Sequence, residues 1–463
     1  MIALLERIID EIPDWETRIL KLETASSLGA IVWVAWAIGL EVARVLVENE
    51  LWSRAKLPTE WPNCPHCGSR LNSKGFQKRS IVTLVGTVNW SRRVGRCPLK
   101  CQNSQRVPLD ELLLIKPDQK TSDEVMRLGC LLAIFVPFGI TSQLLKQLTG
   151  IKVCSQTIGN WIASKGRLTM EKTQKEIAAF EQGDNPIAES LPCEVEKMAL
   201  ALAADGVMVP FRPQEKTPSG ATQWREVKVG VIARLGAYFT RSGKTATRLH
   251  QRRLVAVLGN INDLCPRLML EAIRSGLHRA SKVVWLSDGG VGFWNLYYQY
   301  LAPLNVIGVL DFYHAAGHLW SAAAAYKDGR TREAKNWFKQ WRHHLRHGDS
   351  IEVILELEKV LALGCLTPSQ RQIIRRVHNY LKIHENHITY KSFEAEAIPR
   401  GSGMVESACK WLIQQRFKGV GMRWSSEGFN HLLHLRLAWV NGRFDDLFSD
   451  ANFFSNSGSS PNF

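Results

Sequence analysis

Acidic side chains are scarce relative to basic ones in this sequence of 463 residues, with 43 Asp and Glu against 59 Lys and Arg. The resulting net charge of +16 favours a polyanionic partner. Nucleic acid is the simplest such partner, because Lys and Arg displace the counterions condensed on phosphates. Charge alone leaves open a basic protein without such a partner, since net charge governs association and not fold.

The first residues lack a basic stretch followed by an apolar core and a cleavage site, so we expect no secretion signal and a cytoplasmic, nucleoid-associated protein. The ten cysteines are then expected to be reduced, some of them as metal ligands. One apolar run, residues 25–47, approaches membrane-spanning length, but Glu41 and Arg44 interrupt it. We therefore expect a buried or self-associating helix and no membrane partner.

The chain is too long for one hydrophobic core, so two to four domains are expected. Dense apolar runs predict strands buried on both faces at 198–204, 227–234, 283–287 and 306–310. No internal repeat is visible. The expected segments are a helical region 1–57, a zinc-ribbon-like module 58–115, a helical region 116–182, an α/β region 183–314, a helical stretch 315–397, a second α/β part 398–447 and a disordered tail 448–463.

Two cysteine pairs, Cys64 with Cys67 and Cys97 with Cys101, have C-x2-C and C-x3-C spacing and stand 29 residues apart. Zinc takes four such soft ligands in a tetrahedron, and alternating residues around Gly86 predict a hairpin between the pairs. We expect one structural Zn²⁺ and a basic ribbon presented to DNA or protein, with Arg79, Arg92, Arg93 and Arg96. Four unrelated buried thiols are the alternative, and the other six cysteines are interpreted as core residues.

Residues 141–148 and 155–165 predict two helices joined by a turn at Gly150, as in a helix-turn-helix. The second helix would present Gln156, Asn160 and Lys165, which suit base edges or phosphates. An ordinary helical hairpin without a DNA role explains the same pattern.

Three acidic residues stand in glycine-bearing contexts. Asp205 and Asp288 each follow a predicted strand, and Glu406 lies at the start of a predicted helix. A carboxylate at the end of a buried strand faces the sheet edge where ligand sites of α/β proteins gather. Carboxylates hold the two Mg²⁺, roughly 3.5–4 Å apart, that assist phosphodiester cleavage. Taken singly, each Asp-Gly is also an ordinary turn.

Between the second and third acids lies Asp311-Phe312-Tyr313-His314, after the predicted strand 306–310. Asp311 and His314 could bind metal, position DNA, or hold the core through a buried Asp–His hydrogen bond. We favour a structural or positioning role, because a histidine in such a context is commonly a satisfied hydrogen-bond partner.

Together these motifs resemble the bacterial DDE insertion-sequence transposases of the ISKra type, which are related to the Mutator-like superfamily. The resemblance covers roughly residues 60–445 and is carried by Ala204-Asp205-Gly206, Ser287-Asp288-Gly289-Gly290, 310–315, 401–407 and Gly421-Met422-Arg423-Trp424-Ser425.

The resemblance implies an RNase H-like α/β core, interrupted by an all-helical insertion before the helix that bears the glutamate. The 117 residues between Asp288 and Glu406 leave room for it. It further implies that Asp205, Asp288 and Glu406 hold two Mg²⁺, with Mn²⁺ as a substitute. The implied reaction is cleavage of terminal inverted repeats in double-stranded DNA, followed by direct attack of the 3′ end on target DNA. Synapsis of two ends implies a homodimer or higher oligomer.

A basic run after Glu406 suits contact with the DNA backbone and stacking on bases. Its candidates are Lys410, Arg416, Lys418, Arg423 and Trp424. A solvated helix face explains each of them equally well. Three other functions stay open: a DNA-binding descendant of a transposase that no longer cleaves, a nuclease on the same core, and a zinc-ribbon scaffold that binds protein partners. The scaffold would leave the three acidic residues unexplained.

Overall fold

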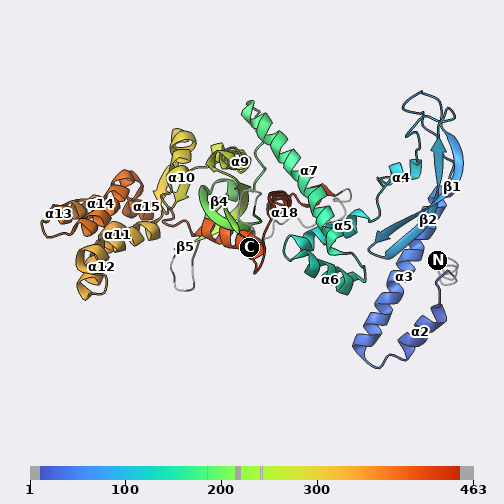
Figure 1. Ribbon diagram of the computed structural model, residues 1–463, viewed down its shortest axis with the longest axis horizontal. Helices are drawn as coiled ribbons and strands as arrows, with labels where there is room; N and C mark the ends of the chain where they lie inside the picture. Colours follow the sequence, from blue (N-terminus) through green and yellow to red (C-terminus); the bar gives the residue numbers. More distant parts are fainter. Residues whose placement is uncertain are drawn as a thin grey trace. The chain divides into compact units, whose positions relative to one another are not determined.

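The computed structural model describes residues 11–184, 186–213, 221–239, 241, 243 and 245–448 (Figure 1). Residue contacts divide them into two compact units, one of residues 11–162 with 445–448 and one of the described residues from 163 to 444. This boundary lies inside the predicted helical region 116–182. Residues 449–463 of the predicted tail lie outside the described residues.

The first unit begins with helices and an antiparallel hairpin. Helices α2 (Trp15–Glu23) and α3 (Leu28–Lys56) precede strands β1 (Asn72–Thr83) and β2 (Gly86–Arg96). The predicted hairpin is confirmed, because β1 pairs with β2 from Thr83↔Gly86 outward. Gly86 has φ 105°, a conformation that a side chain at this turn would strain.

Helix α3 is the apolar run of the sequence, and the expectation that it is buried is wrong for the described residues. Only Val45 and Ala55 of this helix are buried, and Trp33 and Trp36 are 64% and 54% exposed. By length and composition this helix passes the test for a membrane span, which is weak evidence for a single helix near an N-terminus. Its self-association stays a prediction.

Three short helices continue the first unit, and a long helix passes from it into the second. They are α4 (Pro108–Leu112), α5 (Asp123–Ala133), α6 (Phe138–Thr149) and α7 (Ser155–Glu181). Gly150 ends α6 with φ 77°, as the predicted turn requires. The second predicted helix is much longer than expected.

The second unit is built on a five-stranded mixed sheet with strand order β5-β4-β3-β6-β7. The strands are β3 (Ala199–Phe211), β4 (Gln223–Phe239), β5 (Thr245–Leu258), β6 (Val283–Ser287) and β7 (Ile307–Leu310). The pairs β3–β4 and β4–β5 are antiparallel, whereas β3–β6 and β6–β7 are parallel. All four predicted strands are present, and β6 and β7 are buried nearly throughout.

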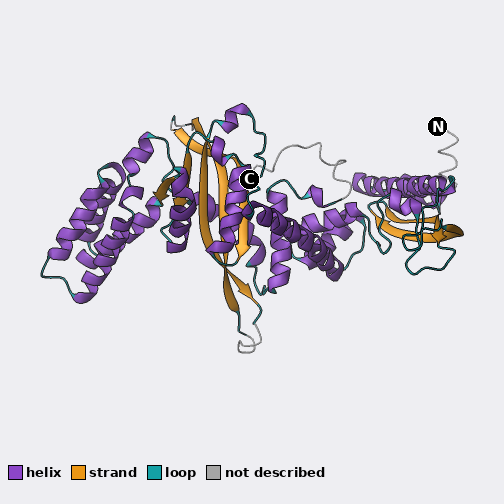
Figure 2. Cartoon of the chain, turned by 90° about the horizontal axis from the view of Figure 1, so that it is seen from above, coloured by secondary structure: helices purple, strands orange, loops and turns teal. Residues whose placement is uncertain are grey.

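Helices cover both faces of this sheet (Figure 2). Alternate residues of β3 face opposite sides, because a strand has a two-residue repeat. Gly230, paired with Ala204, faces α9 (Ile261–Arg274), where an added Cβ would lie 2.9 Å from Leu268. Phe211 faces the other side and contacts the ring of Phe429 in α18 (Ser426–Val440) at 5.2 Å. Asp205, an even number of residues from Phe211, shares that second face.

A group of helices separates β7 from the end of the unit. They are α11 (Phe312–Lys327), α12 (Arg332–His347), α13 (Ser350–Ala362), α14 (Pro368–Ile383), η4 (Glu385–His387) and α15 (Tyr390–Ala395). Their own apolar core includes the fully buried Leu319, Leu357 and Leu381. We call α11 to α15 the helical insertion; it begins three residues before the predicted position 315.

Shorter elements connect these parts. They are α8 (Cys193–Glu196), η1 (Leu277–Arg279), α10 (Val291–Leu296), η2 (Tyr297–Leu301), η3 (Ala302–Leu304), α16 (Gly403–Ala408), η5 (Cys409–Gln414), α17 (Gln415–Phe417) and η6 (Asp445–Leu447).

Two features of the sheet differ from the sequence prediction. Strand β5 was not expected, because its run Arg248 to Arg253 is polar and basic, and only the pairing with β4 makes it a strand. Strand β3 was expected to end before Asp205 but continues to Phe211, because β4 supplies hydrogen-bonding partners along its full length.

Candidate active site and metal centre

Asp205 and Asp288 lie at the same level of neighbouring strands. The parallel register pairs Ala203 with Leu286, and β6 ends one residue later at Ser287. Continuing this register by two residues places Asp205 opposite Asp288. Asp205 is therefore inside its own strand, yet at the carboxyl end of the parallel part of the sheet, where β3 has lost its β6 partner.

Glu406 reaches the same region from a distant part of the chain. It lies on α16, which packs against β3 and β4, and its side chain is 47% exposed. The helical run continues through η5, a π-helical segment of the kind frequently found at functional sites. The buried Arg436 of α18 donates to the carbonyls of Trp411 (2.7 Å) and Leu412 (2.9 Å) in this segment. These bonds fix the helix that carries Glu406.

The three carboxylates act on one another electrostatically. Burial raises the pKa of Asp205, and the charges of Asp288 and Glu406 raise it further. The Gly206 amide, which donates to Asp205 Oδ1 at 2.7 Å, and the nearby His314 act in the opposite direction. The two charge effects on Asp205 show that Asp288 and Glu406 lie close enough for their charges to act on it.

Asp311 connects the helical insertion to the segment that carries Glu406. It caps α11, accepting from the backbone amides of Tyr313 (2.7 Å) and His314 (2.9 Å). Its other oxygen accepts from the amide (2.5 Å) and hydroxyl (2.7 Å) of Ser402, the residue before α16. Asp311 is almost fully buried. These four bonds favour the structural or positioning role over metal binding. The bond from His314 comes from its backbone amide and not from its exposed ring.

Asp288 is held by a residue that no sequence motif marked. Tyr380 of α14 donates its hydroxyl to the Asp288 carbonyl at 2.9 Å and stacks on His318 with ring centroids 4.0 Å apart. Gly289 has φ 92°, and an added Cβ would lie 2.5 Å from the Tyr380 hydroxyl. Burial raises the pKa of Tyr380, so the hydroxyl stays a proton donor. The glycine after Asp288 is thus required both by conformation and by this contact.

Cys409 was predicted to be a core residue, and it is buried, but it also reaches the acidic site. Its Sγ lies 4.0 Å from Asp205 Oδ2. Burial and the charges of Asp205 and Glu406 raise the pKa of this thiol to about 12. It therefore remains a neutral thiol that can donate to Asp205. Its position three residues after Glu406 could have suggested this contact, since such residues share a helix face.

The four predicted zinc ligands come together in the first unit. The Sγ atoms of Cys64, Cys67, Cys97 and Cys101 all lie within 4.8 Å of one another, the one group of possible metal ligands meeting this limit among the described residues. Gly68 has φ 72° and donates its amide to the Cys64 carbonyl at 2.9 Å, which closes the first knuckle. The alternative of unrelated thiols is excluded, and the cluster could hold a metal such as zinc.

The basic ribbon expected next to these cysteines is only partly exposed. Arg92 is buried and pairs with Asp110 at 3.2 Å. Arg79 donates to backbone carbonyls of the segment 116–119. Both side chains are therefore structural, because a guanidinium that donates to acceptors of the protein has fewer donors left to bind phosphate. Arg93 lies over the ring of Phe76, and Arg96 is exposed.

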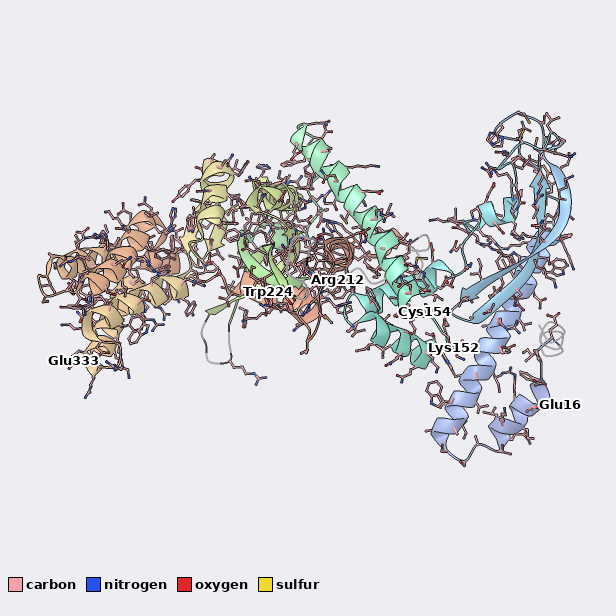
Figure 3. All side chains as sticks on the ribbon, viewed as in Figure 1. Glu16, Lys152, Cys154, Arg212, Trp224 and Glu333 are labelled. Carbon is pink, nitrogen blue, oxygen red and sulfur yellow. The ribbon has the colours of Figure 1, made fainter. Side chains whose placement is uncertain are left out.

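The predicted helix-turn-helix residues are differently placed. Lys152 and Cys154 lie in the turn between α6 and α7 (Figure 3). Gln156 and Asn160 are exposed one turn apart on α7 and hydrogen-bond to each other at 3.0 Å. Lys165 is only half-exposed and belongs to the second unit. Because Gln156 and Asn160 are the more exposed residues, they fit the predicted contact with DNA better than Lys165 does.

Two of the five candidates after Glu406 are withdrawn. Arg416 is 3% exposed and lies over the ring of Trp424. Trp424 itself donates to the Phe417 carbonyl at 3.0 Å and pairs with Phe211 beside β3. The Arg416 side chain is buried and the half-buried Trp424 ring is engaged in packing, so neither is an exposed surface for DNA. The other three are exposed, with Lys410 Nζ 3.9 Å from Glu406 Oε2, Lys418 over the ring of Trp224, and Arg423 after Gly421.

Comparisons with known proteins give limited information about the chain. No family model and no curated protein matches it. Among solved structures, it is similar to a chain of the Drosophila P element transposase strand transfer complex, with 11% identity and a TM-score of 0.26. That match covers 66% of this chain and 97% of the other. This similarity is weak, and the description of the acidic site does not depend on it.

Proposed function

We propose that this chain is a metal-dependent DNA transposase of the DDE class, with Asp205, Asp288 and Glu406 as its catalytic metal ligands. The proposed reaction is cleavage at the terminal inverted repeats of an insertion sequence and joining of the 3′ ends to target DNA. The mixed five-stranded sheet, followed by the helical insertion and the glutamate-bearing helix, supports an RNase H-like core of the ISKra type.

The observation that carries this proposal is the convergence of three distant acidic residues on one end of the parallel strands. Asp205 and Asp288 share a level by strand register, and α16 packs beside them with Glu406. If each acid were only an ordinary turn residue, their positions in the fold would be unrelated to one another. Burial raises the pKa of Asp205, and the negative charges of Asp288 and Glu406 add to this rise by repulsion.

The donor set fits Mg²⁺, with Mn²⁺ as a substitute, because hard divalent cations take carboxylate oxygens and would relieve that repulsion. Such cations, when bound, stabilise the attacking and leaving oxygens of phosphoryl transfer. The protein positions the ligands: Tyr380 holds the Asp288 backbone, and Asp311 holds the start of α16. The neutral Cys409 thiol lies against Asp205 on the buried side.

The remaining parts have roles within the same proposal. One structural Zn²⁺ at the four cysteines would stabilise the hairpin module, as closed tetrathiolate sites do. Gln156, Asn160, Lys410, Lys418 and Arg423 are the exposed candidates for contact with double-stranded DNA. We further propose a homodimer or higher oligomer in the cytoplasm, associated with the nucleoid and without a membrane partner.

The decisive experiment is a cleavage and strand-transfer assay on repeat-end DNA with Mg²⁺, comparing the wild-type chain with Asp288→Asn. The substitution keeps the size of the side chain and removes its charge. We expect product formation to fall by at least about 10²-fold, while DNA binding and the melting temperature are kept. Asp328→Asn is the matched control, because Asp328 is an exposed loop residue with φ 56°, which asparagine tolerates.

Each other outcome assigns a different function. Equal activity of the wild-type chain and the Asp288→Asn variant would make Asp288 a turn residue and disprove the triad. Cleavage without joined donor–target products would identify a nuclease on the same core. DNA binding without cleavage in the wild-type chain would identify a DNA-binding descendant that has lost catalysis.

A further inference from the structure

Helix α12 in the helical insertion has two chemically distinct faces. Its apolar positions are buried or half-buried: Ala334 and Leu345 are within 1% of full burial, and Trp337 and Phe338 contact rings of α11. The opposite positions, three or four residues apart, carry Lys335, Lys339, Arg342, His343, Arg346 and His347. Because helix neighbours are three and four residues apart, these six side chains form one face, which we call the basic face of α12.

The basic face borders an open groove of about 510 Å³. Every described residue that lines the groove is basic or amide-bearing, and none is acidic. The only acidic residue of α12 is Glu333, in its first turn at the far end of the helix (Figure 3). Two histidines of the groove have acidic partners: Glu352 bonds His344 at 2.7 Å, and Glu394 lies 3.6 Å from His347 and 3.0 Å from Arg400. The lysine and arginine side chains that line the groove form no ion pair with an acid among the described residues, so they offer positive charge to a ligand.

The basic face adjoins the segments that form the acidic site. The guanidinium of Arg342 lies over the ring of Phe312, 5.4 Å from its centroid. Phe312 directly follows Asp311, and its amide donates to the Arg400 carbonyl at 2.8 Å. Arg400 in turn leads through Gly401 and Ser402 into α16. A polyanion lying along α12 would therefore pass beside the loop that carries Glu406 to the acidic site.

We infer that the basic face of α12 binds the phosphodiester backbone of the DNA strand that enters the acidic site, without reading its sequence. The inference rests on the proposed function, for which it names a DNA-contact surface. From Lys335 to Arg346 the helix rises about 16 Å, the length of about five nucleotides of one strand at 3.4 Å each. Lysine and arginine side chains without paired acids suit phosphate oxygens, and a groove lined by basic and amide-bearing side chains favours a polyanion over a protein partner.

The test measures the affinity of the full-length chain for a duplex of arbitrary sequence by fluorescence anisotropy, between 50 and 200 mM salt and without added Mg²⁺. The variant Lys339→Gln/Arg346→Gln removes two charges from the basic face. We expect Kd to rise about tenfold near 100 mM salt, and the slope of log affinity against log salt to fall by about 2. If that variant melts early, Lys335→Gln/Lys339→Gln replaces it, because both lysines are exposed.

The matched control is Lys359→Gln/Arg375→Gln, which removes two exposed charges from α13 and α14 of the same insertion. It should leave the salt slope within about 0.5 of wild type. An equal loss in both variants, or no loss in the first, would overturn the inference. Unchanged DNA affinity together with a changed oligomeric mass would assign the face to protein contacts and overturn it as well. The assay contains no cleavage step, so a failure of the triad in the Asp288→Asn experiment leaves this result independent.

Discussion

The two candidate metal centres of this chain are assembled in opposite ways. The four cysteines come from one hairpin module, in which 38 residues of sequence contain every ligand and both knuckle turns. The three carboxylates come from strand β3, the end of β6 and α16, across 202 residues. The cysteine cluster has its ligand atoms within 4.8 Å of one another. Strand register brings Asp205 level with Asp288, and the packing of α16 adds Glu406.

The two sites obtain their geometry from different kinds of contact. Local turns place the cysteines, with Gly68 at φ 72° closing one knuckle. The acids depend on strand register and on second contacts from elsewhere, namely Tyr380 at Asp288 and Asp311 at Ser402. We therefore expect the cysteine site to control folding of its own module, and the acidic site to be adjustable from positions that carry no motif.

The largest effect should come from removing one cysteine ligand. Cys97→Ala is expected to abolish binding of about one zinc ion per chain and to lower the stability of the hairpin module by several kcal/mol, because metal binding and folding are coupled in such modules. Metal content by elemental analysis and thermal unfolding measure both. Cys365→Ser, at an exposed cysteine, is the control and should change neither. Full metal content in Cys97→Ala would contradict a local four-cysteine site.

A smaller effect is expected at the buried link between the insertion and α16. Asp311→Asn replaces an oxygen that accepts two bonds, so it should lower the free energy of unfolding by about 2–3 kcal/mol. It should also reduce cleavage, because α16 loses its attachment. Asp349→Asn is the matched control: Asp349 caps α13 through one amide, and asparagine caps equally well. Chemical denaturation should show a loss below about 0.5 kcal/mol for the control. Equal losses would mean that Asp311 is only a helix cap.

The smallest effect on stability, but the most selective one, is expected from Tyr380→Phe. The ring can still stack on His318, while the bond to the Asp288 carbonyl is lost. Stability should fall by about 1 kcal/mol, and the Mg²⁺ concentration for half-maximal cleavage should rise about tenfold. Tyr297→Phe removes an equivalent bond to the Val306 carbonyl, before β7, and should change stability alone. A shift in Mg²⁺ dependence in both variants, or in neither, would show that Tyr380 has no positioning role.

Much of the local structure could be predicted from the sequence, because neighbouring residues determine it. The alternation around Gly86, the turn at Gly150 and the dense apolar runs of β3, β6 and β7 each predicted the element found. Strand β5 could not be predicted in this way, since its polar run Arg248 to Arg253 becomes a strand only by pairing with β4. The burial of Arg92 and Arg416 was missed for a similar reason, because their partners Asp110 and Trp424 come from other segments.

By itself, the sequence determined the chemical types that this protein has available: four thiolates at knuckle spacing, three acids in glycine-bearing contexts and an excess of positive charge. Spacing along the chain suffices for the cysteines, because their module folds locally. Only the tertiary structure decided that Asp205 lies level with Asp288, that α14 supports Asp288 through Tyr380, and that α12 turns its charges outward. The physical reason is that sheet register and helix packing join residues up to about 200 positions apart, and these contacts leave no periodic signal in the sequence.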